Sequence, residues 1–441
     1  MTFEDFILLH QDDDPARLLL SKNQYPEVDV SLAVNTIESR RKLRKKVPGW
    51  YAVPGLVFPS PLSAEQCSSS ASAEYKSALV SGLIGKGGKV ADLTGGLGVD
   101  AAAFAGVSGE VLYNEMSAEL ADAVRKNFSL LGLGNVRFSC RAVEKSALES
   151  ILGGFRPDLI FLDPARRDAF ARKVFRLEDC SPDIVALQDE LLSACRYVLV
   201  KISPLADISM ALRTLRNISE IHIVESDGEC KELLLLLDRG FTAGSPLVTV
   251  ASLGKSADAA NESAASAYGL RFKSLSFHLE EETAAAATFI ECADILQKSA
   301  KGHEPDASGP EPQANSLGLK GLQLFEPGKA LMKSGAFSLI SARFGLLKLD
   351  RHTHLYVAEK IPGELRGLGK VYSIIDVAPL GRQSFRDFGR KYPQAEVTAR
   401  NVPMTSDALR KKLGCASGGS VHIFCTTAAS ERILIATALQ S

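Results

Sequence analysis

The sequence predicts an α/β protein, built on a doubly wound and largely parallel sheet and ending in a smaller α+β region. Two observations support this fold class. Residues 76–240 alternate apolar runs of strand length with helix-length segments, and the strand at 89–92 runs directly into a glycine turn and a helix. From residue 370 onward, the pattern of strand, helix, strand, helix and two strands is typical of a small α+β module.

The strands predicted within 76–240 form one sheet of seven. Residues 226–231 alone join the last two, and this connection is too short for a right-handed crossover between parallel strands. We therefore expect the sheet to close with an antiparallel hairpin, whereas dehydrogenase sheets usually stay parallel. The predicted strands lie near residues 89–92, 111–115, 135–140, 158–163, 196–202, 220–225 and 232–238.

The regions around this sheet differ in character. Residues 1–75 are predicted to be helical and to end in a proline-rich approach to the sheet. Residues 241–320 are predicted to be an irregular connection, with a flexible, polar, proline-containing loop at 303–315. Two small modules are predicted to follow, at 321–369 and 370–441.

Composition limits the classes of protein to which the chain can belong. With 46% hydrophobic and 23% charged residues among 441, we expect two or three domains with a sizeable core. A net charge of −1 means that any nucleic-acid contact must come from local basic patches. The eight cysteines form no C-x-x-C pair, and the seven histidines show no ligand spacing, so neither a metal site nor a disulfide framework is predicted.

Two segments of the sequence indicate a cellular location. Met1 to Asp14 is acidic and lacks the basic stretch of a secretory signal, and the apolar run at 233–237 is far too short to span a bilayer. We expect a cytoplasmic protein that does not enter a membrane. The sequence does not indicate an oligomeric state.

The glycine turn after the first strand predicts a nucleotide site, and two cofactors compete for it. Gly96-x-Gly98-x-x-Ala101 satisfies a relaxed dinucleotide fingerprint, with Glu115 about where a ribose-binding acid should fall, as in a dehydrogenase. Asp92, however, precedes the glycines and would repel a pyrophosphate while suiting the ammonium of S-adenosylmethionine. Together with Asp163, which ends the fourth strand, this order of parts favours a class I methyltransferase.

S-adenosylmethionine is thus the predicted cofactor. Asp92 would bind the methionine amine and Glu115 the ribose hydroxyls, although Asp100 could equally cap the following helix. The position of the adenine-binding acid holds Ala142, with Glu144 two residues later. The predicted cofactor-binding residues are Asp92, Thr94, Gly95, Gly96, Gly98, Asp100, Glu115, Met116, Glu144, Asp163 and Pro164.

Several segments together carry a resemblance to a known family. They are Glu65-Gln-Cys-Ser-Ser-Ser70 with Tyr75-Lys76, Asp92-Leu-Thr-Gly-Gly-Leu-Gly-Val-Asp100, Leu162-Asp-Pro-Ala-Arg-Arg167, Lys201-Ile-Ser-Pro204, Glu229-Cys-Lys-Glu-Leu233, Leu324-Phe-Glu-Pro327 and Thr398-Ala-Arg-Asn-Val-Pro403. Over nearly its whole length the chain resembles bacterial class I methyltransferases that carry a ferredoxin-like insert and a C-terminal THUMP-like domain. The resemblance implies a Rossmann-like methyltransferase sheet at 76–240, a ferredoxin-like domain at 321–369 and a THUMP-like domain at 370–441. It also implies methyl transfer to RNA, either tRNA or rRNA.

Two acceptor chemistries remain open. Asp163-Pro164 matches the start of the amine-methylating motif, but Ala165 and Arg166 replace its second proline and aromatic residue. Lys76, Asp163, Lys201 and Glu232 occupy positions that correspond to the Lys-Asp-Lys-Glu tetrad of ribose 2′-O-methyltransferases. Our hypothesis is that Lys201, its pKa lowered by partial burial and a neighbouring cation, assists deprotonation of a 2′-hydroxyl. Alternatively, Lys201 merely extends from a strand end, and Glu232 caps the hairpin.

Two basic segments are candidate substrate contacts. Arg166 and Arg167 could bind the phosphates of a nucleic acid, or pair with Glu178 and Asp179 instead. The run at 40–46 is either a patch for an anionic partner or a solvated helix face. The predicted function is S-adenosylmethionine-dependent methylation of structured RNA. The alternatives are a methyltransferase for a small molecule or a protein, and a non-catalytic RNA-binding protein that retains the fold.

Overall fold

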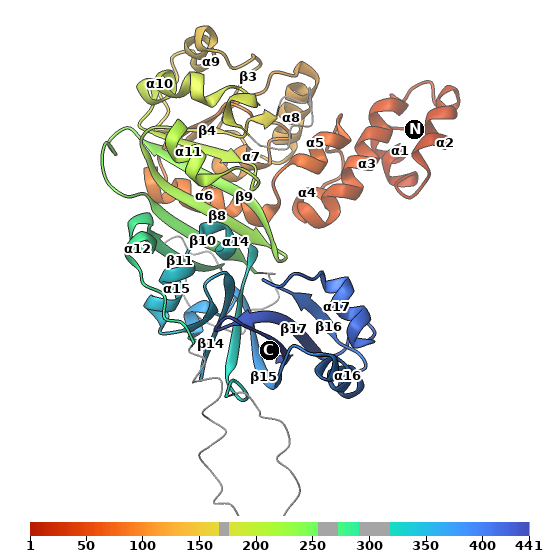
Figure 1. Cartoon of the computed structure of the whole chain (residues 1–441). Coiled ribbons are helices and arrows are strands. Elements are labelled where there is room, and N and C mark those ends of the chain that lie inside the picture. The colour runs from red at the N-terminus through yellow and green to blue at the C-terminus, as the bar shows by residue number, and fades with distance from the viewer. Residues whose placement is uncertain (167–175, 255–271, 291–317, 441) are drawn as a thin grey trace, which may run out of the picture. The chain divides into compact units, whose positions relative to one another are not determined.

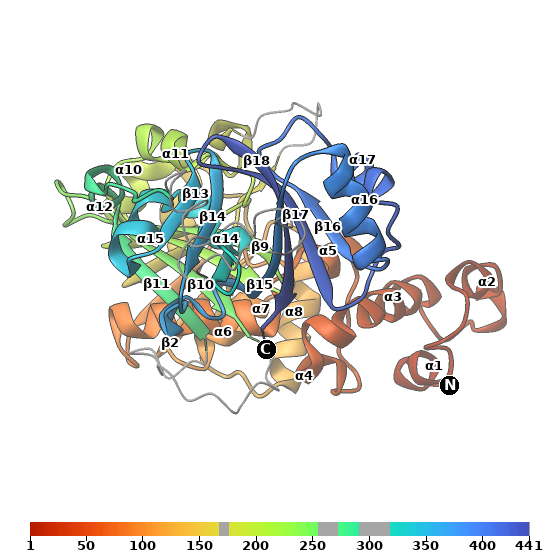
Figure 2. The ribbon, with the colours of Figure 1, turned by 60° about the horizontal axis from the view of Figure 1, so that its bottom comes forward.

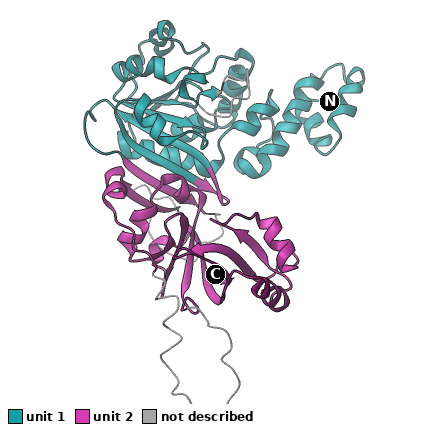
Figure 3. Ribbon diagram, viewed as in Figure 1, with its two compact units in different colours: residues 1–224, 231–246, 255–272 teal, residues 225–230, 247–254, 273–441 magenta. Residues whose placement is uncertain are grey.

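The structure of the chain is a computed structural model that describes residues 1–166, 176–254, 272–290 and 318–440 (Figure 1). The chain forms two compact units (Figure 3). Unit 1 comprises residues 1–224, 231–246 and 255–272, and unit 2 comprises 225–230, 247–254 and 273–441.

Unit 1 begins with helices, four of which start with a side chain that accepts a hydrogen bond from the backbone of the first turn. Thr2, Asp14, Asp29 and Ser60 are these caps, and a proline follows two of them directly. The first three helices pack around a small apolar core that includes Phe6, and the predicted N-terminal helical region is confirmed. They are α1 (Phe3–Leu9), α2 (Pro15–Leu20), α3 (Val30–Lys46), α4 (Pro48–Tyr51) and α5 (Pro61–Gln66).

The sheet of unit 1 has the strand order β8-β9-β7-β4-β1-β2-β3. Strand β9 runs antiparallel to β7, whereas β3, β2, β1, β4 and β7 pair in parallel, so the predicted closing hairpin is confirmed. The elements are α6 (Ser70–Ile84), β1 (Lys89–Asp92), α7 (Val99–Ala105), β2 (Glu110–Asn114), α8 (Ala118–Leu130), β3 (Val136–Ser139), α9 (Leu148–Leu152), β4 (Leu159–Leu162), α10 (Ile184–Ala194), β7 (Tyr197–Ile202), α11 (Ile208–Thr214), β8 (Ile218–Ser226) and β9 (Glu229–Asp238).

The central strands are apolar along their length because helices cover both faces of a doubly wound sheet. Every residue of β4 is buried, and so are residues 233–237 of β9. The short leucine run is therefore a core strand. Within the described part of the chain, no helix is long and apolar enough to cross a membrane.

Unit 2 contains a sheet with the strand order β13-β14-β12-β15-β18-β17-β16. Helices α16 and α17 pack on β16 to β18 through Phe388, Leu409 and Leu413, and Figure 2 shows both helices beside β16 and β17. The elements are β12 (Gln323–Pro327), α14 (Lys329–Ser334), α15 (Phe337–Phe344), β13 (Leu347–Asp350), β14 (Thr353–Ala358), β15 (Gly369–Pro379), α16 (Arg382–Lys391), β16 (Glu396–Ala399), α17 (Ser406–Leu413), β17 (Val421–Ala428) and β18 (Glu431–Leu439).

The region predicted to be an irregular connection, 241–320, differs from that expectation. It contains strands β10 (Leu247–Leu253) and β11 (Phe272–His278), which are neighbours in a sheet, and helix α12 (Leu279–Ala284). The alternation of buried residues in β11 gave a strand signal, but the surrounding alanine- and serine-rich sequence obscured it. The loop predicted at 303–315 lies outside the described residues.

Candidate functional site

A cavity of about 1220 Å³ lies at the carboxyl edge of the parallel strands of unit 1. Segments that follow five neighbouring strands line it, because the carboxyl ends of parallel strands meet at one edge of a sheet. These lining segments are residues 92–100, 115–117, 141–144, 163–165 and 201–205. The cavity thus contains every residue that the sequence predicts to bind the cofactor.

The glycine turn after β1 needs its glycines for two different reasons. Gly96 and Gly98 adopt φ values of +54° and +80°, the left-handed region that other residues rarely occupy. A Cβ on Gly95 would lie 2.1 Å from Cε2 of Tyr113, and one on Gly98 would lie 2.8 Å from the Phe128 ring. The backbone therefore approaches β2 more closely than a side chain would permit, and it leaves space on the cavity side.

Asp92 ends β1 with its side chain almost wholly buried, at 1% exposure. Its Oδ1 accepts a hydrogen bond from Thr94 N at 3.1 Å, but its buried Oδ2 has no partner among the described residues. Burial, followed by the nearby Asp100 carboxylate, raises the pKa of Asp92 well above its ordinary value. A buried carboxylate oxygen that lines a cavity and lacks a donor suits a cationic ligand group.

Glu115 follows β2 and supports the glycine turn. Its Oε2 accepts a hydrogen bond from Gly96 N at 3.0 Å, and its Oε1 accepts one from Ser117 N at 2.9 Å. Each carboxylate oxygen can accept a second bond, so the side chain can still bind a diol. Met116, beside it, is 71% exposed and lines the same cavity.

Asn114 is a structural residue of the site that the sequence analysis did not identify. It is fully buried, and its amide donates to Leu93 O at 3.0 Å and to Arg141 O at 2.9 Å. Its Oδ1 also accepts from Arg141 N at 3.2 Å, so one side chain joins the segments that follow β1, β2 and β3. The sequence did offer a signal for this role, namely an amide residue directly before the predicted ribose-binding acid. A side-chain amide can donate two hydrogen bonds and accept another, as Asn114 does here.

The structure brings together the four residues predicted to act on the acceptor. Lys201 Nζ lies 2.6 Å from Asp163 Oδ2 and 3.8 Å from Glu232 Oε1. Lys76 Nζ lies 2.7 Å from Glu232 Oε2 and 3.1 Å from Asp100 Oδ1. These residues come from α6, from the ends of β4 and β7, and from the start of β9. They form one connected cluster of opposite charges.

Exposure divides this cluster into two pairs. The side chains of Lys76 and Glu232 are 0% and 5% exposed, so we call them the inner pair. Those of Lys201 and Asp163 are 12% and 36% exposed and line the cavity, and we call them the outer pair. Only the outer pair can reach a ligand, and the inner pair acts through it.

The expected lowering of the Lys201 pKa is wrong. Burial does lower the pKa of this ammonium, but the carboxylates of Asp163, Glu232 and Asp100 outweigh burial and hold the pKa above its ordinary value. For Glu232, burial raises the pKa, and the two lysines outweigh it, so the pKa lies below its usual range. The free protein therefore holds Lys201 as a cation and Glu232 as an anion.

Comparison with known proteins supports this description of the chain. A ferredoxin-like domain model matches residues 324–364, and a THUMP domain-like model matches residues 369–438. The crystal structure of a proposed methyltransferase from Porphyromonas gingivalis W83 is 28% identical, with a TM-score of 0.79 over 100% of this chain and 98% of the other. The chain therefore shares the fold of this structure over its whole length, and its C-terminal part matches a ferredoxin-like and a THUMP-like domain.

Other solved structures match only part of the chain. An rRNA methylase from Streptococcus thermophilus is 12% identical and covers 37% of this chain and 93% of its own, with a TM-score of 0.29. A proposed methyltransferase from Streptococcus mutans, in complex with SAH, is 9% identical and covers 37% of this chain and 96% of its own, with a TM-score of 0.28. No curated protein matches the chain.

Of the two arginines predicted to bind substrate, the structure describes only Arg166. Arg166 lies in the short strand β5 (Ala165–Arg166), which pairs with β6 (Cys180–Ser181). Arg167 lies outside the described residues. A phosphate contact by Arg166 and Arg167 thus stays a prediction.

Much of the basic run at 40–46 serves the N-terminal helices of this methyltransferase-fold chain. Arg40 and Arg41 donate hydrogen bonds to backbone carbonyls of neighbouring segments. Lys42 Nζ lies 2.6 Å from Glu65 Oε2, and Lys46 Nζ donates to Glu65 O. These contacts fix α5 to α3, so the run is less available to an anionic partner than its composition alone suggests.

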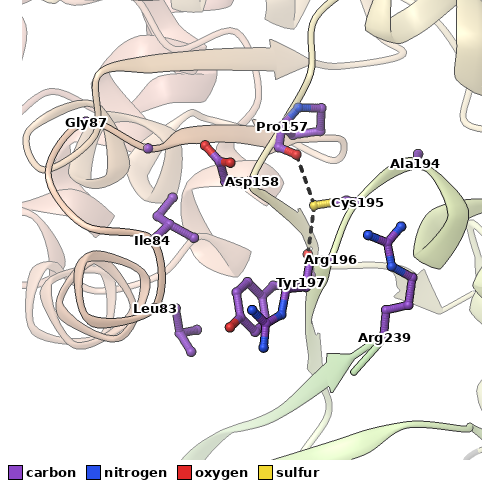
Figure 4. Close-up of a pocket in the computed structure, with 11 residues that line it drawn as sticks. Leu83, Ile84, Gly87, Pro157, Asp158, Ala194, Cys195, Arg196, Tyr197 and Arg239 are labelled. Atoms are coloured by element: carbon purple, nitrogen blue, oxygen red, sulfur yellow. Dashed lines mark hydrogen bonds between the residues drawn. The ribbon is translucent and has the colours of Figure 1, made fainter. Parts of the chain in front are cut away.

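A second cavity, of about 580 Å³, lies at the opposite edge of the sheet, where β4 and β7 begin (Figure 4). Cys195 Sγ lies 3.3 Å from the carbonyl oxygens of both Pro157 and Tyr197 and can donate its one proton to either. Burial raises the pKa of the Cys195 thiol to about 11, which leaves it protonated and inert. Arg196, also in this cavity, pairs with Asp238 at 3.1 Å. The described residues thus satisfy these polar groups internally.

Proposed function

We propose that this chain is a cytoplasmic S-adenosylmethionine-dependent methyltransferase that acts on structured RNA, either tRNA or rRNA. The observation that carries the cofactor assignment is the buried Oδ2 of Asp92, which lines the main cavity without a partner among the described residues. The ammonium of the methionine moiety would supply the missing donor and the compensating charge.

The cradle around Asp92 fits the rest of the cofactor. The turn that contains Gly95, Gly96 and Gly98 leaves room for its body, and Glu115 would bind the ribose hydroxyls. Glu144 lines the cavity where adenine would lie. A dinucleotide fits less well, because its pyrophosphate would meet the Asp92 carboxylate.

The outer pair would face the methyl acceptor. When bound, S-adenosylmethionine supplies an electrophilic methyl group. Asp163 is the more exposed member and can orient an acceptor hydroxyl or amine and receive its proton, while Lys201 holds the Asp163 carboxylate in place. Glu232 contacts Lys201, and Lys76 in turn contacts Glu232, so the inner pair supports Lys201. Catalysis would thus rest chiefly on positioning, with proton removal at Asp163.

RNA is the proposed substrate because of the THUMP-like match at 369–438. Arg166 and Arg167 would add phosphate contacts. Either a base or a ribose 2′-hydroxyl fits the outer pair, but a base within a helix would have to leave its stack first.

The first test is methyl incorporation from labelled S-adenosylmethionine into total RNA of a strain that lacks the protein, followed by digestion to nucleosides. One new methylated nucleoside would identify the substrate class and the ribose or base position. Lys201→Met and Asp163→Asn should bind cofactor and lose incorporation. Asp158→Asn, at the opposite edge of the sheet, should retain it. Label in protein or in small molecules, with none in RNA, would refute the RNA assignment. Absence of cofactor binding would refute the assignment as an S-adenosylmethionine-dependent methyltransferase.

A further inference from the structure

One buried hydroxyl connects all the charged groups behind the outer pair. Ser68 lies between α5 and α6 and is 4% exposed. Lys76 Nζ donates to its Oγ at 2.9 Å, and Lys201 Nζ donates to it at 3.4 Å. The same Oγ lies 2.8 Å from Asp100 Oδ2 and 3.2 Å from Glu232 Oε1. Ser68 is therefore in contact with both lysines and with two carboxylates.

The chemistry of a hydroxyl limits what Ser68 can do. Its two lone pairs are used by the two lysines, and its single proton can be donated to only one carboxylate at a time. Asp100 belongs to the first turn of α7, directly after the glycine turn, and Glu232 belongs to the inner pair. The hydroxyl thus links the cofactor turn to the residues that face the acceptor.

We propose that Ser68 is a positioning residue for methyl transfer, which holds Lys201 against Asp163 and ties that pair to the cofactor turn through Asp100. This inference rests on the proposed function. Ser68 lines the main cavity beside the outer pair, and its hydroxyl is held by Lys201, Lys76 and Asp100, through which it acts. The segment that bears it leads from the N-terminal helices, so those helices help to build the acceptor side of the site.

The effect of removing the hydroxyl follows from the remaining contacts of Lys201. Without Ser68 Oγ, the ammonium keeps Asp163 at 2.6 Å and a longer contact to Glu232 at 3.8 Å. It gains freedom to move along the cavity wall, and the Asp163 carboxylate moves with it. The cofactor contacts of Asp92 and Glu115 do not involve Ser68, and Asp100 keeps its ion pair with Lys76 at 3.1 Å, so cofactor affinity should be unchanged.

The test compares Ser68→Ala with the conservative Ser68→Thr and with Ser77→Ala. Ser77 is a buried serine on α6, and its hydroxyl donates to the Glu74 carbonyl at 2.9 Å. Ser68→Ala should lower methyl incorporation about 10- to 100-fold at unchanged cofactor affinity and should shift its pH profile. Ser68→Thr should recover most of the rate. Equal rates in Ser68→Ala and Ser77→Ala would overturn the inference, as would a parallel loss of cofactor affinity.

A second measurement needs no substrate. A small amine-acylating reagent is added, and mass spectrometry follows modification of Lys201 relative to Lys231, an exposed lysine of the same cavity. Ser68→Ala should accelerate the modification of Lys201 severalfold, since a restraint on its ammonium is lost. An unchanged rate would overturn the inference alone. If Ser68→Ala accelerates the modification of Lys201 but the parent protein incorporates no methyl group into any acceptor, the proposed function and the positioning role are overturned together.

Discussion

Lys76 Nζ lies 2.7 Å from Glu232 Oε2, although the two residues are 156 positions apart in the chain. The antiparallel direction of β9 produces this contact. Because β9 runs against β7, its first residues lie at the carboxyl edge of the sheet, next to the ends of the parallel strands. Glu232, near the start of β9, therefore lies at the edge where β7 ends. The closing hairpin thus supplies a carboxylate that a fully parallel sheet would place at the opposite edge.

The inner pair should contribute strongly to stability. Lys76→Met would leave the Glu232 carboxylate buried with less compensation, and we expect a loss of about 3–5 kcal/mol in the free energy of unfolding. The double variant Lys76→Met/Glu232→Gln should recover much of that loss, because it removes both charges. Urea denaturation of the single and double variants measures the free energy of unfolding of each. A double variant no more stable than Lys76→Met would show that the two residues are not coupled.

Asp92→Asn should separate cofactor affinity from stability. Loss of a charge-assisted contact to the cofactor ammonium should weaken binding about 10- to 150-fold, as measured by calorimetry. The free variant should melt at a higher temperature than the parent protein at neutral pH, because it no longer carries a carboxylate whose ionisation burial opposes. Asp158→Asn is the control and should change neither the cofactor affinity nor the melting temperature. A free Asp92→Asn protein that melts lower would contradict this account.

The raised pKa of Asp92 also predicts two opposite pH dependences. The stability that Asp92 contributes is fully present below its ordinary pKa of 3.8 and is lost as pH rises through the raised pKa. Cofactor affinity should increase over that same interval, because the ammonium requires the ionised carboxylate. Calorimetry in buffers of different ionisation enthalpy should show proton release on binding. No proton release at any pH in that interval would mean that Asp92 is already ionised in the free protein.

Gly95→Ala should disturb the cofactor turn through simple overlap. The added Cβ would lie 2.1 Å from a ring carbon of Tyr113, and relief of this contact should cost about 1–3 kcal/mol of stability. Because the turn must shift, cofactor affinity should also fall. Gly134→Ala, where no atom lies within 4 Å of the new Cβ, is the matched control for thermal unfolding and binding. Equal effects of the two substitutions would argue against the close approach of Gly95 to Tyr113.

Local patterns were enough to predict the main elements of the fold. The short link at 226–231 predicted the hairpin, because chain length alone forbids a crossover there. The two helices predicted after residue 370 are confirmed as α16 (Arg382–Lys391) and α17 (Ser406–Leu413). The glycine turn likewise placed Asp92 and Glu115 at the cavity, since residues at the ends of neighbouring parallel strands must meet. Strand β10 was missed, because its apolar run lies in a region of mixed, low-complexity sequence.

By itself, the sequence determined the order of the elements, the glycine turn and the residue types at the strand ends, because each depends on neighbours only a few positions away. Only the tertiary structure decided which groups touch. Ser68 meets Lys201 across 133 positions. The charge of Lys201 was decided in the same way, since burial and the surrounding carboxylates oppose each other and their distances determine which one prevails.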